Sequence, residues 1–233
     1  MSQDPVLYER KDKVAVIRLD DGKVNALSHA GIDAIHAALD RAEKEAGAVV
    51  IAGRPGRFSA GFDLSVMGQG GDAVVGLITA GAELALRLYG FPSPVVGACT
   101  GHALAMGAIL LLSMDTRIGA EGDFKIGLNE VAIGMTLPVF GVEFARERLS
   151  KRHLSRAVVE AEIYRPSDAV DAGFLDRVVA PEAVVDTACA EAARLQAGLH
   201  ADAHRNTKLL LRKGAIERIR GSLAGLGDIT GGG

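Results

Sequence analysis

The chain has 233 residues, of which 48% are hydrophobic and 24% charged, a balance typical of one sizeable globular domain with a well-filled core. Its net charge of −3 and its lack of basic runs exclude the footprint of a nucleic-acid-binding protein. The longest apolar stretch, Ala103 to Met114, is too short to span a bilayer. Two distant cysteines predict no disulfide framework. With no secretion-signal pattern at the start, we expect a cytoplasmic protein without membrane contact.

The first third of the chain alternates strand and helix patterns. Val6–Arg10 and Lys13–Leu19 alternate apolar and polar residues around a short polar link, which predicts a hairpin. Ser28 is a suitable N-cap for a helix from His29 to about Ala46. Ala48–Ala52 is wholly apolar, which is typical of a strand covered on both faces.

The rest of the chain continues this alternation and then becomes rich in helices. Strands next to helices indicate βαβ units and a largely parallel sheet. We predict an α/β core over 1–180 and a short helical region over 181–233. The expected strands are Val95–Ala98, Thr116–Ala120, Phe124–Gly127 and Phe174–Val179, and the expected helices are Ala73–Tyr89, Ala105–Met114, Pro138–Leu149, Leu154–Glu162, Pro166–Ala172, Glu182–Leu195 and Ala203–Leu223.

One carboxylate, Glu130, stands in an otherwise apolar setting. It lies in the segment Gly127–Gly134, GLNEVAIG. Apolar neighbours disfavour the charged form of a carboxylate and raise its pKa, which suits a general base. The alternative is a structural glutamate that caps a helix or pairs with an arginine such as Arg117.

Two turns of small residues, Phe58–Leu64 and Ala103–Gly107, each join apolar runs. Such turns can leave backbone N–H groups unpaired and directed at a developing oxyanion. The alternative for either turn is ordinary geometry with glycine at positive φ.

Other motifs carry little weight. The glycine-rich run Gly68–Ala73 does not follow a clean buried strand, which argues against a dinucleotide site. His200 and His204 have the spacing of a metal pair, but no glutamate lies between them on the helix. We therefore expect surface histidines and no metal site.

Three segments together resemble the signatures of the crotonase superfamily, the enoyl-CoA hydratases and isomerases. In chain order they are VNAL (24–27), FSAGFDL (58–64) and GHALAMG (101–107). The segment KIGLNE (125–130), followed by Leu137-Pro138, is similar to the Δ3,Δ2-enoyl-CoA isomerase branch. The resemblance implies an α/β fold with a spiral of ββα units and a helical C-terminal layer. It also implies an acyl-CoA thioester as substrate, no separate cofactor, and a homotrimer or a dimer of trimers.

The resemblance assigns roles to individual residues. It implies that the backbone N–H groups of Phe62 and Met106 hold the thioester oxygen, with Gly107 in place of Met106 if the alignment shifts by one residue. Two such donors stabilise an enolate-like transition state, and each typically contributes about 10²–10³ in rate. Glu130 would be the catalytic acid and base. The residues implied for CoA are Lys23, which could meet phosphate oxygens, and Ala26, Leu27, Ala60 and Asp63.

Three departures from the family pattern bear on the activity. Ile109 stands where hydratases carry one of their two glutamates. Met106 replaces a usual glycine, so its side chain needs space. The family's final helical segment, which covers the acyl pocket and packs in the trimer, is expected to be shortened or absent after the Lys208 helix.

A single glutamate favours isomerisation over hydration. A 1,3-proton shift needs only one base, which removes a proton from C2 and returns it at C4, whereas hydration is shared between two carboxylates. The expected activity is therefore the conversion of 3-enoyl-CoA to 2-enoyl-CoA. One alternative is a 2-enoyl-CoA hydratase, or a broad hydratase/isomerase, that uses Glu130 and a water held by backbone groups. The other is a catalytically silent acyl-CoA-binding protein.

Overall fold

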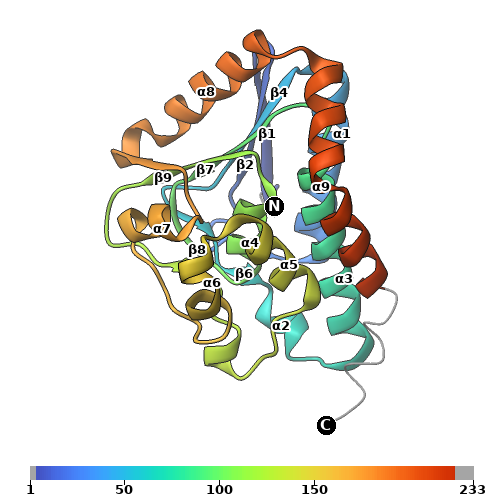
Figure 1. The fold of residues 1–233 in the computed structure, drawn as a ribbon, viewed down its shortest axis with the longest axis vertical. Coiled ribbons are helices and arrows are strands. Elements are labelled where there is room, and N and C mark those ends of the chain that lie inside the picture. Colours follow the sequence, from blue (N-terminus) through green and yellow to red (C-terminus); the bar gives the residue numbers. More distant parts are fainter. Residues whose placement is uncertain (1–3, 224–233) are drawn as a thin grey trace.

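The computed structural model describes residues 4–223 (Figure 1). Its main sheet has six strands in the order β1-β2-β4-β7-β9-β11. The first two strands form the expected antiparallel hairpin, and every other neighbouring pair is parallel. The strands are β1 (Val6–Lys11), β2 (Val14–Leu19), β4 (Ala48–Ala52), β7 (Val95–Cys99), β9 (Thr116–Ala120) and β11 (Arg177–Val179).

Two small sheets lie beside the main one and hold the turns of small residues. One pairs β3 (Ala26–Leu27) with β6 (Gly61–Phe62), and the other has the order β10-β8-β5. The strands of the second sheet are β5 (Gly56–Ser59), β8 (Gly101–Leu104) and β10 (Ile126–Gly127). These strands have two to four residues each. Such lengths carry almost no periodicity, so the sequence pattern did not predict most of them.

The helices alternate with the strands as expected. Ser28 caps α1, because its hydroxyl accepts a hydrogen bond from the Gly31 N–H at 3.2 Å. Every residue of α4 is buried, as its apolar sequence requires. The helices are α1 (His29–Glu45), α2 (Leu64–Met67), α3 (Gly71–Tyr89), α4 (Met106–Ser113), α5 (Val139–Arg148), α6 (Lys151–Val158), α7 (Pro166–Ala172), α8 (Val184–Gly198) and α9 (Ala201–Leu223), with 3₁₀ turns η1 (Val131–Ile133) and η2 (Pro181–Ala183).

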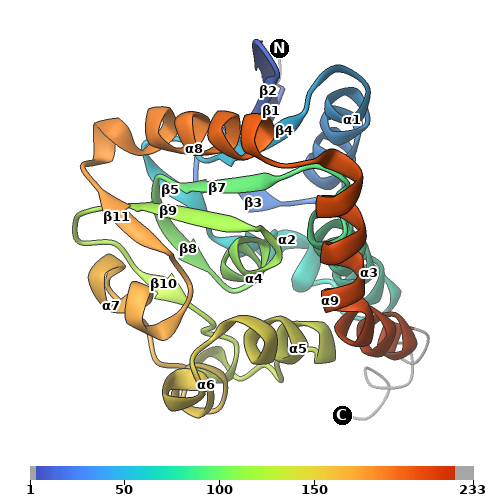
Figure 2. The same cartoon turned by 45° about the horizontal axis from the view of Figure 1, so that its top comes forward.

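Helix α8 covers one face of the main sheet, and α1, α3 and α4 lie on the other side (Figure 2). Val184, Ala188 and Ala192 of α8 pack against the small and β-branched residues of that face. Helix α9 packs against α5 and α3. The two C-terminal helices therefore contact the α/β core directly, and the division at residue 180 stays a prediction.

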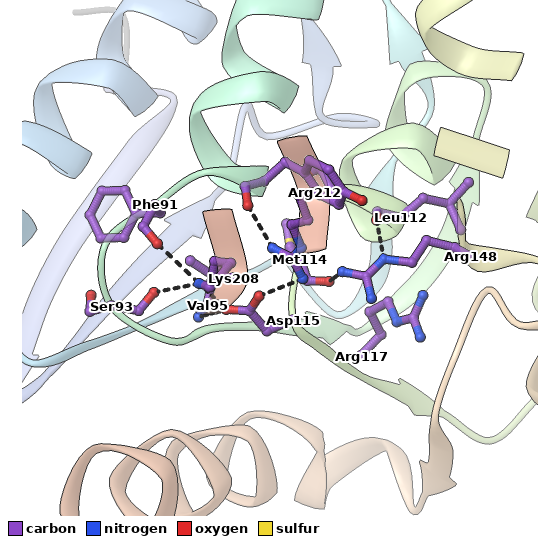
Figure 3. Close-up of polar contacts among 12 residues, drawn as sticks. Phe91, Ser93, Val95, Leu112, Met114, Asp115, Arg117, Arg148, Lys208 and Arg212 are labelled. Carbon is purple, nitrogen blue, oxygen red and sulfur yellow. Dashed lines mark hydrogen bonds and ion pairs between the residues drawn. The ribbon is translucent and has the colours of Figure 1, made fainter. Parts of the chain in front are cut away.

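A buried ionic cluster fixes α9 to the core (Figure 3). The carboxylate of Asp115 accepts from Lys208 Nζ at 2.6 Å and pairs with Arg212 at 2.8 Å. Lys208 also donates to the carbonyls of Phe91 and Ser93, each at 3.0 Å. Since all three donors of the ammonium are used, this charge can be buried. The cluster holds α9 beside the loop between α3 and β7.

The structure corrects three predicted boundaries. The helix expected over Leu154–Glu162 runs from Lys151 to Val158 instead, because the backbone leaves helical geometry before Ala161, whose φ is 52°. The strand expected over Phe174–Val179 is confined to β11, since the N–H groups of Phe174 and Leu175 donate to the carbonyl of Ala169 and close α7. The helix expected over Glu182–Leu195 begins at Val184 and continues to Gly198.

Among the helices in residues 4–223, none has the length and apolar character needed to cross a membrane.

Candidate active site

A cavity of about 260 Å³ lies between α2, α3, α4, η1 and the start of α5. Its volume lies just below the usual range for small-molecule sites, about 300–1,000 Å³. Apolar side chains form most of its wall. Within the described part of the chain, Asn129 and Glu130 are the two residues with polar side chains that line it.

Glu130 is buried, with 6% of its surface exposed. Its side chain does not cap η1, and its Oε2 atom has no hydrogen-bond partner among residues 4–223. Its backbone carbonyl accepts from the N–H groups of Ile133 and Met135, which fixes the main chain. Burial raises the pKa of the carboxyl to about 7.

The structural alternatives for Glu130 do not apply. Arg117 pairs with Asp176 at 2.6 Å instead. A carboxyl whose pKa lies near neutrality can both accept and return a proton. Glu130 thus has the environment of a general base.

The backbone N–H groups of Phe62 and Met106 are directed away from strand and helix pairing. The Asp63 N–H donates to the carbonyl of Leu27 at 3.1 Å. Because successive N–H groups of a strand alternate in direction, that of Phe62 points away from β3. Met106 is the first residue of α4, so its N–H has no partner within the helix.

The two N–H groups lie in segments that contact each other. A Cβ on Gly61 would be 3.3 Å from the Met106 nitrogen and 2.9 Å from the Cβ of Ala105. Gly61 also has a φ of +96°, which favours glycine. Glycine therefore permits β6 to approach the start of α4, as an oxyanion hole requires.

The side chain of Met106 has a defined place. A Cβ on Gly81 of α3 would lie 2.4 Å from Phe62 Cζ and 3.4 Å from Met106 Cε, so both side chains pack on this glycine. The neighbouring Gly107 abuts the carbonyl of Ser59, since a Cβ there would be 2.4 Å from that oxygen. Met106 and Gly107 both belong to the first turn of α4, and the choice between them as donor stays a prediction.

Ile109 is buried and lines the same cavity as Glu130. It lies in α4, and its side chain faces α5. The position at which hydratases are expected to carry a second acid is thus part of an apolar wall.

The residues predicted to meet CoA are only partly brought together. Ala60 is exposed and lines the cavity, whereas Lys23, Ala26, Leu27 and Asp63 are outside its lining. They belong to neighbouring segments, because β3 pairs with β6 and the Ala60 N–H donates to the carbonyl of Val24. Lys23 is exposed, Leu27 is buried, and the Asp63 carboxylate caps α2 by accepting from the Ser65 N–H at 2.8 Å. Their contacts with CoA stay predictions.

Other chemistries have little support in residues 4–223. No group of three or more His, Cys, Asp or Glu side chains there could hold a metal ion. Burial raises the pKa of the Cys99 thiol to about 12, which leaves it protonated and a poor nucleophile.

Sequence reasoning overlooked Asn129 and most of the apolar wall. The wall includes Leu64, Ile78, Ile133 and Phe140, which come from separate segments. Asn129 gave one signal, since it directly precedes Glu130 in an apolar run.

The chain matches the family model described as Enoyl-CoA hydratase/isomerase over residues 9–217. It is similar to the human protein named enoyl-CoA delta isomerase 1, mitochondrial. The two are 32% identical over 211 residues, which cover 88% of this chain and 70% of the human protein.

Solved structures agree with this match in fold. The apo structure of an enoyl-CoA isomerase from Mycobacterium tuberculosis has a TM-score of 0.93 and 43% identity, over 97% of this chain and 98% of that one. A second structure of the same mycobacterial protein, there called a probable enoyl-CoA hydratase, has a TM-score of 0.94 and 43% identity, over 98% and 97% of the two chains. One protein thus carries both names, and the chain belongs to the enoyl-CoA hydratase/isomerase family of the crotonase superfamily.

Proposed function

We propose that the protein is an enoyl-CoA isomerase that converts a 3-enoyl-CoA thioester to its 2-enoyl isomer. One observation carries the proposal: Glu130 is the carboxylate that lines the cavity, and Ile109 stands where a hydratase is expected to have a second one. The names of the human relative and of one mycobacterial structure support it.

The reaction requires a proton to leave C2 of the substrate. Glu130 accepts this proton through its Oε2 atom, which has no hydrogen-bond partner among residues 4–223. The electron pair of the C2–H bond moves onto the thioester oxygen and gives an enolate. The N–H groups of Phe62 and Met106 stabilise the negative charge on this oxygen.

The same carboxyl completes the reaction by returning the proton to C4. The electrons of the C3–C4 double bond form the new bond to this proton, and the enolate electrons form the C2–C3 double bond. A pKa near 7 makes Glu130 a stronger base than an ordinary glutamate and still lets it return the proton. The enolate itself is made accessible by the two N–H donors. The apolar wall limits exchange of the held proton with water.

The substrate enters with its CoA part beside β3 and β6 in this proposal. Lys23 is exposed next to these strands and supplies positive charge for phosphate oxygens. The pantetheine part lies along Ala26, Leu27, Ala60 and Asp63. The acyl chain occupies the apolar cavity.

The predicted assembly is a homotrimer or a dimer of trimers. Leu210 and Leu211 of α9 are each 78% exposed, and exposed leucines in a pair support contact with another copy. Sedimentation equilibrium distinguishes these assemblies from a monomer.

Incubation with 3-enoyl-CoA tests the activity. The wild-type protein should form 2-enoyl-CoA, measured through the absorbance of the conjugated thioester. Glu130→Gln should reduce the rate by at least about 10²-fold, the usual range for an acid–base residue. Failure of the wild type to convert any chain length would contradict the proposal, and acyl-CoA binding without turnover would favour a silent binding protein.

A second candidate is a 2-enoyl-CoA hydratase. The other name given to the same mycobacterial protein, probable enoyl-CoA hydratase, favours it. Formation of 3-hydroxyacyl-CoA as the main product, without isomerisation, would select this candidate.

A further inference from the structure

Ser59 is a buried polar residue that has no part in the proton transfers described above. It is the last residue of β5, it is fully buried, and it does not line the cavity that holds Glu130. Its Oγ atom donates to the carbonyl of Asn25 at 2.8 Å and accepts from the Gly61 N–H at 3.2 Å. The hydroxyl group thus joins the residue before β3 to the first residue of β6.

Asn25 gives this hydroxyl group a fixed partner. Its φ is 55°, a conformation that asparagine adopts more readily than most residues. Its side-chain amide donates to the carbonyls of Leu19 and Phe58 at 2.9 and 3.0 Å. Its backbone N–H donates to the carboxylate of Asp21 at 2.9 Å. Because these contacts hold Asn25 in place, its carbonyl is a rigid acceptor for Ser59.

The other hydrogen bond of Ser59 restrains the segment that carries the Phe62 N–H. Phe62 directly follows Gly61, and a glycine at positive φ has few steric limits on its backbone. The Ser59 hydroxyl fixes the N–H before this joint. The Asp63 N–H, bonded to the carbonyl of Leu27, fixes the chain after it. The Phe62 N–H lies between these two restraints.

Ser59 also supports the segment that carries the Met106 N–H. A Cβ on Gly107 would lie 2.4 Å from the carbonyl oxygen of Ser59 and 2.9 Å from its Cβ. The first turn of α4 therefore packs directly on Ser59. One buried residue contacts both segments whose N–H groups must converge on a single oxygen atom.

We propose that Ser59 is a positioning residue, whose hydroxyl group holds the Phe62 N–H in the direction that binds the thioester oxygen. The inference rests on the proposed function, because it uses the same oxyanion hole. Ser59 is buried outside the cavity lining, so it acts through the backbone of Gly61 and Phe62. Its contribution should be larger for the enolate than for the bound thioester, because negative charge develops on the oxygen.

Ser59→Ala removes the hydroxyl group and should lower kcat for 3-enoyl-CoA by about tenfold to 10²-fold, because misplacing a reacting group by about 1 Å costs about 10²-fold. KM should change much less than kcat, since the apolar wall is unaltered. Ser59→Cys fills the same place, but a thiol donates and accepts hydrogen bonds weakly. Its kcat should lie between those of the wild type and Ser59→Ala.

A saturated acyl-CoA labelled with carbon-13 at the thioester carbonyl tests the donors without turnover. Hydrogen bonds to a carbonyl oxygen lower the frequency of its stretching vibration. Infrared difference spectra should therefore show a lower frequency for the thioester bound to the wild type than for the free thioester, and a smaller shift with Ser59→Ala. A residue that only stabilised the fold would leave this frequency as in the wild type.

Ser113 provides a matched control. It is buried at the end of α4, and its hydroxyl donates to the carbonyl of Leu110 at 2.7 Å. Ser113→Ala should leave kcat and the carbonyl frequency unchanged. Circular dichroism checks that each variant is folded. Wild-type kcat and frequency in a folded Ser59→Ala or Ser59→Cys protein would overturn the inference, and so would equal losses in Ser59→Ala and Ser113→Ala.

The inference and the proposed function fail in different ways. A wild-type protein that isomerises 3-enoyl-CoA, with serine variants that all behave like it, would overturn the role of Ser59 alone. A wild-type protein that binds the saturated thioester but does not isomerise would overturn the proposed function, and the carbonyl frequencies would still decide whether Ser59 positions the donors.

Discussion

The Cδ1 atom of Ile109 lies 3.1 Å from the point where a Cβ on Gly141 would stand. Because Gly141 has no side chain, α5 approaches α4 closely enough for Ile109 to fill the space between them. Leu137 reaches the same point, at 2.9 Å. The contact makes this side of the cavity a tightly packed apolar wall, in which a carboxylate would have no partner.

Replacement of Ile109 tests whether the missing acid decides the reaction. Ile109→Glu should raise hydration of 2-enoyl-CoA by about 10²-fold, because a second carboxylate shares the activation of water. Ile109→Gln has a similar size without the charge and should give no such gain. Product analysis by mass spectrometry measures both variants. A folded Ile109→Glu protein without increased hydration would show that Ile109 does not limit this activity.

Gly61 tests the oxyanion hole without changing a catalytic side chain. Gly61→Ala should lower kcat by about 10²–10³-fold, the effect of losing one oxyanion donor, because the new Cβ would meet Ala105 and displace the Met106 nitrogen. Gly56→Ala is the matched control, since Gly56 also has positive φ but open space around it. Steady-state kinetics distinguish the two variants. If kcat fell equally in Gly61→Ala and Gly56→Ala, the loss would come from backbone strain and not from the oxyanion hole.

Gly61 shows which features of the fold and the site the sequence could predict and which it could not. The motif around Gly61 and the alternation of strands and helices were sufficient for the fold class. The approach of Gly61 to Met106 joins segments about 45 positions apart in the chain, and local patterns carry no such distance information. The resemblance to a family supplied that pairing instead.

Tertiary contacts also explain the overlooked residues. Asn129 is a candidate because its side-chain oxygen is buried with no hydrogen-bond partner in the described part of the chain, and no local sequence pattern predicts such burial. The apolar wall combines α2, α3 and α5, and each of its residues alone is indistinguishable from core. The strand expected over Phe174–Val179 begins only at Arg177, because the Phe174 N–H donates to the carbonyl of Ala169 at the end of α7.

The pH dependence of the reaction follows from the pKa of Glu130. The base must be ionised in the free enzyme, so kcat/KM should rise with pH and level off, with its midpoint at about 7. Rates with 3-enoyl-CoA in a series of buffers measure this midpoint. A midpoint near 4.5, the ordinary value for a glutamate, would contradict a buried base.

The same burial makes Glu130 costly for stability. The folded carboxyl binds its proton more tightly than the unfolded one, so the wild-type free energy of unfolding should fall as pH rises from 4.5 to about 7. Glu130→Gln removes this titration and should be more stable than the wild type above pH 7, by about 3 kcal/mol. Urea unfolding at both ends of the range measures the difference. If the free energies of unfolding of wild type and Glu130→Gln differed by the same amount at both pH values, the raised pKa of Glu130 would be contradicted.

The most direct test of the account follows one hydrogen atom through the reaction. 3-Enoyl-CoA labelled with deuterium at C2 should give, in a single turnover in ordinary water, 2-enoyl-CoA with part of the deuterium at C4, because Glu130 both removes and returns it. Nuclear magnetic resonance of the product locates the label, and Glu130→Gln should form no such product. Complete replacement by solvent hydrogen at C4, or 2-enoyl-CoA formed at an undiminished rate by Glu130→Gln, would contradict the single-base mechanism.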